Sequence, residues 1–156
     1  MSDPYEELVD GELLFRLPPG LRHEIICARL HQRVCASLTG NGTSRLLAPR
    51  AQVELTRGTV LRPDLALVTV ATGKLWLAAE VISSDDHRSD TVTKKEVYEN
   101  VRVPRLWMID PRYDNIEVYH GGEYGLTLKG MLAGRAALAE PLLPAFTLVV
   151  AELFQA

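Results

Sequence analysis

The sequence predicts an α/β (α+β) fold, in which helices flank a mixed central β-sheet and an additional β-hairpin is present. Apolar residues recur at helical spacing between residues 21 and 38. Residues 75–82 are almost continuously apolar, which is typical of a central strand covered on both faces. A strand, a helix, several strands, a second helix and more strands follow one another, which favours a mixed sheet between helices.

In the first half of the chain, proline and glycine mark the ends of the expected elements. Pro18-Pro19-Gly20 ends an opening strand because proline cannot continue a hydrogen-bonded ladder, and Gly40-Asn41-Gly42 ends the helix that spans 21–38. Arg57-Gly58 is typical of a hairpin turn. We expect short strands at residues 11–17, 45–47, 52–55 and 64–70.

The second half alternates between buried strands and one helix. A helix is expected at 90–100, followed by a buried strand at 105–110 that Pro111 stops. A hairpin is expected around Gly121-Gly122, and residues 146–150 fit either a last strand or a short helix. With 156 residues, the chain is expected to form a single domain over 1–156.

Composition excludes several classes of protein. The 17 Lys and Arg against 20 Asp and Glu give a net charge of −3, and 47% of residues are hydrophobic, which argues against a disordered tail or a histone-like basic binder. No segment reaches the roughly 18 apolar residues of a membrane helix, and the acidic start is unlike a signal peptide. Cys27 and Cys35 lie too far apart on one helix for a disulfide, so we expect a cytoplasmic protein.

Two carboxylates stand out as candidate metal ligands. Glu80 interrupts an apolar strand, where a carboxylate is costly unless it is paired, protonated or bound to metal. Asp64 follows Pro63 at the start of another strand, and both carboxylates would enter one cleft if the two strands were adjacent and antiparallel. Converging hard oxygen donors of this kind suit Mg²⁺, which activates water and neutralises phosphate charge. An edge strand with Glu80 facing solvent or an arginine is the alternative.

Lys94 is the candidate cation of the same site. It lies on the expected helix at 90–100, and Tyr98, four residues later, shares its face. Lys95 points about 100° away, so Lys94 is expected to be the inward lysine, where it would hold a phosphate or orient the attacking water. An ordinary solvated lysine is the alternative.

Four motifs in order resemble the Uma-two family, a bacterial family described as restriction endonucleases. They are Arg62-Pro63-Asp64, Glu80-Val81-Ile82-Ser83, the helix with Arg88, Asp90, Lys94 and Tyr98, and Val103-Pro104 with Trp107 and Asp110-Pro111. Gly11-Glu12-Leu13 and His23 extend the resemblance over nearly the whole chain.

The resemblance implies a restriction-endonuclease-like fold of the PD-(D/E)xK superfamily. It implies that Asp64 and Glu80 bind Mg²⁺, with Mn²⁺ as a substitute, and that the Val81 carbonyl is a third ligand. Ile82 occupies the usual lysine position, so Lys94 is the candidate migrated lysine. Arg102 replaces the glycine usually found before Val103-Pro104.

Two further residues are candidates for the same site. Glu12 would complete the metal site from the first strand, and His23 would contact phosphate or tune a carboxylate. The alternatives are an exposed turn residue for Glu12 and a partly buried helix-start histidine for His23. Asp85 and Asp86 are expected in a solvated turn.

The same helix carries a row of potential ligands for a soft metal. His23, Cys27, His31 and Cys35 recur every four residues, and neighbouring members could chelate such a metal. The row spans about 18 Å, too long to surround one ion, and His23-Glu24-x-x-Cys27 lacks the second histidine of a zinc-protease motif. No functional zinc site is therefore expected from this row.

These features together predict a Mg²⁺-dependent endonuclease that hydrolyses DNA, with a homodimer to cut both strands. Catalysis would rest on Asp64, Glu80, Lys94, Glu12 and His23. Backbone phosphates would meet the lysine pair and five arginines, namely Arg45, Arg50, Arg57, Arg62 and Arg88. The alternatives are a catalytically inactive module that binds nucleic acid or protein, and a phosphodiesterase acting on RNA or a small molecule.

Overall fold

The computed structural model describes residues 3–83 and 88–156 and places their strands in three sheets. The largest sheet contains, from one edge to the other, β10 (Gly125–Ala133), β9 (Asn115–Gly122), β8 (Arg105–Asp110), β7 (Leu75–Val81), β6 (Leu65–Thr69) and β3 (Ser44–Leu46). The second contains β2 (Glu12–Arg16), β1 (Tyr5–Val9), β5 (Thr59–Leu61) and β4 (Val53–Thr56), and the third pairs β11 (Ala137–Glu140) with β12 (Leu143–Val149).

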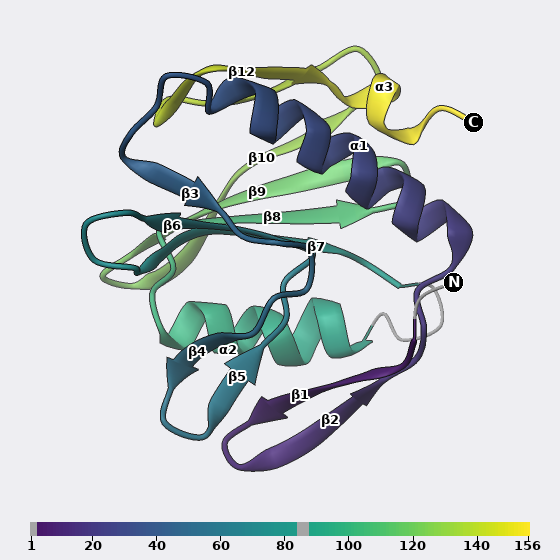
Figure 1. Cartoon of the computed structure of the whole chain (residues 1–156). Helices are drawn as coiled ribbons and strands as arrows, with labels where there is room; N and C mark the ends of the chain where they lie inside the picture. Colours follow the sequence, from purple (N-terminus) through teal and green to yellow (C-terminus); the bar gives the residue numbers. More distant parts are fainter. Residues whose placement is uncertain (1–2, 84–87) are drawn as a thin grey trace.

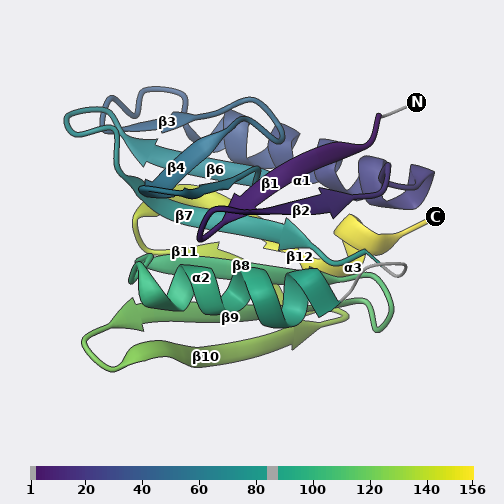
Figure 2. The same ribbon diagram turned by 90° about the horizontal axis from the view of Figure 1, so that it is seen from below.

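The six-stranded sheet is the middle layer of the molecule. One face is covered by α1 (Leu21–Ser37), the β11–β12 hairpin and α3 (Val150–Phe154), which lie above the sheet in Figure 1. The other face is covered by α2 (Lys95–Asn100) and the four-stranded sheet, which Figure 2 shows from below. Each face therefore has its own apolar core, and the prediction of a mixed sheet between helices is confirmed.

The sheet is mixed because β7 and β8 run parallel while its other neighbouring strands are antiparallel. The connection from β7 to β8 contains a π-helical turn, η1 (Ser89–Lys94), that continues directly into α2. A helical crossover between adjacent parallel strands packs back on the sheet, so this topology places α2 against β7. The predicted helix at 90–100 is confirmed, although it begins at Ser89 and its first turns are π-helical.

The backbone at the C-terminal end of α2 explains why the family pattern has glycine at the position that Arg102 occupies in this chain. The amide of Arg102 donates to the Glu99 carbonyl and that of Val103 to the Tyr98 carbonyl, both over 3.1 Å, which is the hydrogen-bonding pattern of a Schellman motif. Arg102 has φ 55°, the left-handed conformation that favours glycine. The arginine therefore occupies a position whose backbone suits glycine.

Several sequence-based boundaries are wrong or incomplete. Gly122 pairs with Gly125, so the β9–β10 turn is formed by Glu123 and Tyr124 and not by the Gly121-Gly122 pair. The final segment contains both alternatives, because β12 leads directly into α3. The sequence reading did not include β1, β5 or β11. The predicted solvated turn at Asp85 and Asp86 lies outside the described residues.

A short sequence pattern beside strand β1, which was not predicted, is typical of a hairpin turn. Strand β1 pairs with β2 across Asp10-Gly11, whose φ angles are 49° and 82°. A two-residue turn with two positive φ angles is the type I′ hairpin that Asp-Gly favours. Within the described residues, no helix is long and apolar enough to cross a lipid bilayer.

Candidate active site

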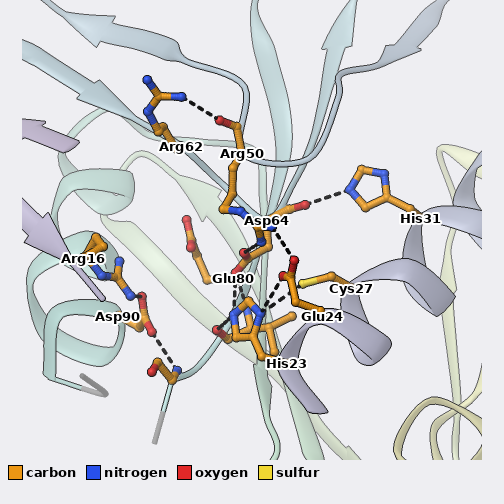
Figure 3. Close-up of polar contacts among 12 residues, drawn as sticks. Arg16, His23, Glu24, Cys27, His31, Arg50, Arg62, Asp64, Glu80 and Asp90 are labelled. Carbon is orange, nitrogen blue, oxygen red and sulfur yellow. Dashed lines mark hydrogen bonds and ion pairs between the residues drawn. The ribbon is translucent and has the colours of Figure 1, made fainter. Parts of the chain in front are cut away.

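Asp64 and Glu80 meet where β6 begins and β7 ends. These strands are adjacent and antiparallel, and Leu65 pairs with Ala79, so Asp64 lies opposite Glu80. The two side chains are 3% and 1% exposed, and Figure 3 shows them beside each other. The two strands are adjacent and antiparallel, which is the condition on which the expected shared cleft depends, and β7 is an interior strand, so the edge-strand alternative for Glu80 is wrong.

Glu80 faces the helix that follows β7. Its Oε1 accepts a hydrogen bond from Lys94 Nζ at 2.7 Å, and its Oε2 accepts one from the Tyr98 hydroxyl at 2.5 Å. Both donors are buried on the same helical face, as their four-residue spacing predicts. Lys95 points elsewhere and donates to the Tyr119 hydroxyl at 3.0 Å. Lys94 is therefore the inward lysine.

Asp64 is also contacted by residues of α1, the helix that covers the other face of the sheet. Its Oδ2 accepts the Val81 amide at 2.8 Å and lies 3.5 Å from His23 Nε2. The same His23 nitrogen is 2.9 Å from the Val81 carbonyl oxygen, and since a carbonyl only accepts, Nε2 carries the proton. His23 therefore contacts both Asp64 and the third expected metal ligand.

Two residues of the loop and helix near Asp64 hold its position. His31 Nε2 donates to the Asp64 backbone carbonyl at 2.7 Å. Arg50 bridges Glu24, at 2.8 Å, and Asp64 Oδ1, at 3.4 Å. Arg50 has φ 56°, a conformation that is costly for a residue other than glycine and that clusters at functional sites. Figure 3 shows these side chains gathered around Asp64.

The first hairpin supplies a carboxylate that the sequence reading missed. Glu7 on β1 is 2% exposed and lies 2.8 Å from Lys94 Nζ and 2.9 Å from Arg16 Nη1. Arg16 in turn binds Asp90, at 2.8 Å, and Asp90 accepts the Ser83 amide at 3.0 Å. We call Glu7, Arg16, Asp64, Glu80, Asp90 and Lys94 the buried ionic cluster.

Glu12, the carboxylate expected from this hairpin, is not brought to the cluster. It is exposed and pairs with Val9 beside the hairpin turn. Four residues of strand separate it from Arg16, a distance of about 13 Å at the usual rise per residue. Glu12 is therefore an exposed residue beside the turn, as the alternative expectation had it. Glu7 is the hairpin carboxylate that reaches Lys94.

The surroundings separate the pKa values of the two central carboxylates. Burial alone would raise the pKa of Asp64, but the hydrogen bond and positive charge of His23 lower it to about 2. Burial raises the pKa of Glu80 to about 8, and the charges of Asp64 and Glu7 oppose the attraction of Lys94. Burial would lower the pKa of Lys94, but the Glu80 and Glu7 carboxylates raise it. Carboxylates with strongly separated pKa values are typical of functional sites.

The donor set is compatible with a divalent metal ion. Glu7, Asp64, Glu80 and Asp90 are each at most 3% exposed, and the cluster's two cations, Lys94 and Arg16, are similarly buried. Half-buried His23 and Arg50 supply further positive charge around Asp64. Two carboxylates and a carbonyl oxygen are the ligands that Mg²⁺ prefers, and a dication would compensate the excess of buried acid. Asp64, Glu80 and the Val81 carbonyl could therefore hold such an ion.

A cavity leads from the surface to His23. Its volume is about 200 Å³, and it is lined by Gly20, Arg22, His23, Ile82, Ser83, Pro111 and Arg112. Ile82, at the usual lysine position, is 2% exposed and packs in the apolar core beside Tyr98. Of the arginines expected to meet DNA, Arg45, Arg57 and Arg88 are exposed, whereas Arg50 and Arg62 are half-buried.

The fold is shared with a solved structure of another protein. It is the crystal structure of a putative nuclease belonging to DUF820 from Anabaena variabilis ATCC 29413, which matches with a TM-score of 0.79 and 15% identity over 98% of this chain and 91% of that chain. The type IIG restriction endonuclease BpuSI matches with a TM-score of 0.48 and 13% identity over 85% of this chain and 15% of its own. No curated protein matches the chain.

The model of the Uma2 (Uma-two) family, described as "Putative restriction endonuclease", matches residues 2–151. The match covers the strands that carry Asp64 and Glu80 and the helix that carries Lys94. The chain therefore belongs to the Uma2 family.

Proposed function

We propose that this protein is a Mg²⁺-dependent endonuclease that hydrolyses phosphodiester bonds in DNA, with Mn²⁺ as a substitute. The observation that carries the proposal is the pairing of buried Asp64 and Glu80 across two adjacent strands, with Lys94 bound to Glu80. The family description and the nuclease named among the solved structures support the same class of reaction.

Asp64, Glu80 and the Val81 carbonyl would hold the metal ion. When bound, the ion would lower the pKa of a water molecule and neutralise charge on the scissile phosphate. Lys94 and Tyr98 orient Glu80 through one hydrogen bond to each carboxylate oxygen. His23 orients Asp64 and contacts the Val81 carbonyl, from a ring that also lines the cavity. A direct contact of Lys94 with water or phosphate stays a prediction.

The cavity beside His23 is suited to admit a phosphate group. Arg22 and Arg112 line it and are exposed, and each is paired with a carboxylate, Asp114 at 2.7 Å and Asp110 at 2.9 Å, so a phosphate would compete with these pairs for the two guanidinium groups. Cutting both strands of a duplex requires two such sites, and each chain supplies one. We therefore propose a homodimer as the active form on duplex DNA, which the molecular mass in solution would test.

Cleavage of supercoiled plasmid by purified protein tests the proposal directly. With Mg²⁺ or Mn²⁺, wild-type protein should nick or linearise the plasmid. Asp64→Asn and Glu80→Gln should each lose at least about 100-fold in rate, equivalent to about 2.7 kcal/mol of barrier. Glu12→Gln is the matched control and should keep the wild-type rate, because Glu12 is exposed beside the hairpin turn.

Equal inactivity of wild type and Asp64→Asn on duplex, single-stranded and branched DNA would reject the DNA nuclease. Cleavage of RNA alone, with the same dependence on Asp64 and Glu80, would keep the chemistry and change the substrate.

A non-catalytic binding module is the second candidate. It is favoured by the saturation of Glu80, both of whose oxygens already accept a hydrogen bond from this chain. Titration with Mn²⁺ separates the two functions. The nuclease should bind the ion with an affinity that falls in both Asp64→Asn and Glu80→Gln, whereas a module with a purely structural cluster should show no such dependence.

A further inference from the structure

Three potential metal ligands of different chemistry converge on the α1 side of Asp64. One ligand atom each of His23, Cys27 and Asp64 lies within 4.8 Å of the other two. Cys27 Sγ is 3.5 Å from His23 Nδ1, and Cys27 is 5% exposed. Figure 3 shows the cysteine, the imidazole and the carboxylate facing one another. His23 and Cys27 lie close together on one helix, and Asp64, which precedes strand β6, is the third potential ligand beside them.

The separation of sulfur and nitrogen matches tetrahedral zinc. With Zn–S near 2.3 Å and Zn–N near 2.0–2.1 Å, two ligands at the tetrahedral angle lie about 3.5 Å apart. The 3.5 Å between Cys27 Sγ and His23 Nδ1 therefore needs no rearrangement of the helix. Asp64 would have to move toward the ion, because its Oδ2 contacts the other ring nitrogen, Nε2, at 3.5 Å and ligand atoms up to 4.8 Å apart exceed the usual span.

One nitrogen of the imidazole is already placed for such a site. His23 Nε2 donates its proton to the Val81 carbonyl, so Nδ1, 3.5 Å from Cys27 Sγ, is the nitrogen that binds an ion once it carries no proton. A backbone acceptor on the second nitrogen is the usual partner of a metal-binding histidine, because it fixes the ring and increases its basicity. His31 holds the Asp64 backbone at 2.7 Å and so supports the third ligand.

The position is distinct from the proposed Mg²⁺ ligands except at Asp64. Glu80 points toward α2, on the opposite face of the sheet from Cys27. A thiolate and an imidazole select a softer ion than Mg²⁺, which prefers oxygen alone. The cavity that His23 lines offers a route for the ion and a water molecule from the surface.

We propose that His23, Cys27 and Asp64 form a binding site for Zn²⁺ or a chemically similar dication, with water in the fourth position. Binding releases the thiol proton of Cys27 to solvent, and the thiolate and carboxylate balance the charge of the ion. Because Asp64 belongs to both donor sets, Zn²⁺ here excludes Mg²⁺ from the proposed catalytic position. This inhibitory consequence rests on the proposed function, whereas the binding site does not.

Absorption of bound Co²⁺ tests the site without DNA. The wild-type protein should bind one equivalent of Co²⁺ with a near-ultraviolet thiolate-to-cobalt band, and added Zn²⁺ should abolish the band. Cys27→Ser and Cys27→Ala should lose the band, and His23→Gln should weaken Co²⁺ binding at least about tenfold. Cys35→Ser is the matched control, because Cys35 is an exposed free thiol on the same helix.

Absence of the band at one equivalent in wild-type protein, its survival in both Cys27 variants, or its loss in Cys35→Ser would overturn the proposal. Glu80→Gln separates this site from the proposed function. It should abolish cleavage and leave the thiolate-to-cobalt band unchanged, so failure of either proposal is visible without the other.

Discussion

Removal of the Lys94 ammonium should be the most damaging single change in the buried ionic cluster. The side chain is fully buried, and Nζ lies 2.8 Å from Glu7 Oε2 and 2.7 Å from Glu80 Oε1. Lys94→Met keeps much of the side-chain volume but leaves Glu80 without its cation, while Glu7 keeps only Arg16. Breaking a buried ion pair by removing one partner costs about 3–5 kcal/mol. That is a large part of the roughly 5–15 kcal/mol that stabilises a typical domain.

Urea unfolding followed by circular dichroism measures this loss. Lys95→Met is the matched control at the neighbouring position, and its half-exposed side chain should cost less than about 1 kcal/mol. The double variant Lys94→Met/Glu80→Gln should recover much of the stability, because the second change removes the carboxylate left unpaired. The double variant also keeps the experiment informative if the single variant fails to fold.

The stability lost in Lys94→Met should also depend on pH. Burial raises the pKa of Glu80 to about 8, against an ordinary 4.5, so the contribution of this group to wild-type stability falls with rising pH between these values. Because the charge of Lys94 lowers this pKa, its removal should raise the pKa further. Above about pH 8 the variant should therefore continue to lose up to about 1.4 kcal/mol per pH unit from this group, whereas the wild type should not. A loss below about 1 kcal/mol in Lys94→Met at pH 9 would refute the reasoning.

Three other predictions concern metal binding and the backbone. Metal binding competes with protonation of Glu80, whose pKa is raised to about 8. Mn²⁺ affinity measured by calorimetry should therefore rise by up to about tenfold per pH unit toward pH 8 and then level off. A constant affinity from pH 6 to 8 would contradict this. Gly121→Ala should lower thermal stability by about 1–3 kcal/mol, because its Cβ would lie 2.0 Å from the Val103 carbonyl oxygen, while Gly122→Ala meets nothing within 4 Å and should be nearly neutral. Arg102→Gly should be about 1 kcal/mol more stable than Arg102→Ala in urea unfolding, because φ is 55° there; equal stability of the two variants would show that the left-handed backbone carries no cost.

Local sequence patterns were sufficient where the spacing of residues within one helix or strand determines the structure. Helical spacing predicted α1 and the shared face of Lys94 and Tyr98, since residues four apart lie one above the other. The uninterrupted apolar run predicted β7 as an interior strand and marked Glu80 as its exceptional residue. The sequence did not decide whether the strand that follows Asp64 lies antiparallel beside β7; the structure places it there.

Glu7 and Glu12 show where such patterns fail. Both are carboxylates on one short hairpin, and nothing in their immediate neighbours distinguishes them. The docking of that hairpin against η1 decides which one reaches Lys94, since Glu7 is buried while Glu12 stays at the exposed end. Asp10-Gly11 would have predicted the turn, but not which face of the hairpin packs inward.

The sequence by itself therefore determined the mixed sheet, the family, and a carboxylate pair with a lysine on the following helix. Only the tertiary structure decided which further charges join them, namely Glu7, Arg16 and Asp90, and that Cys27 and His23 face Asp64. The physical reason is that periodicity follows from contacts within one element, whereas an ionic cluster depends on how separate elements pack. Buried charges need partners, and the chain supplies them from segments as far apart in sequence as Glu7 and Lys94.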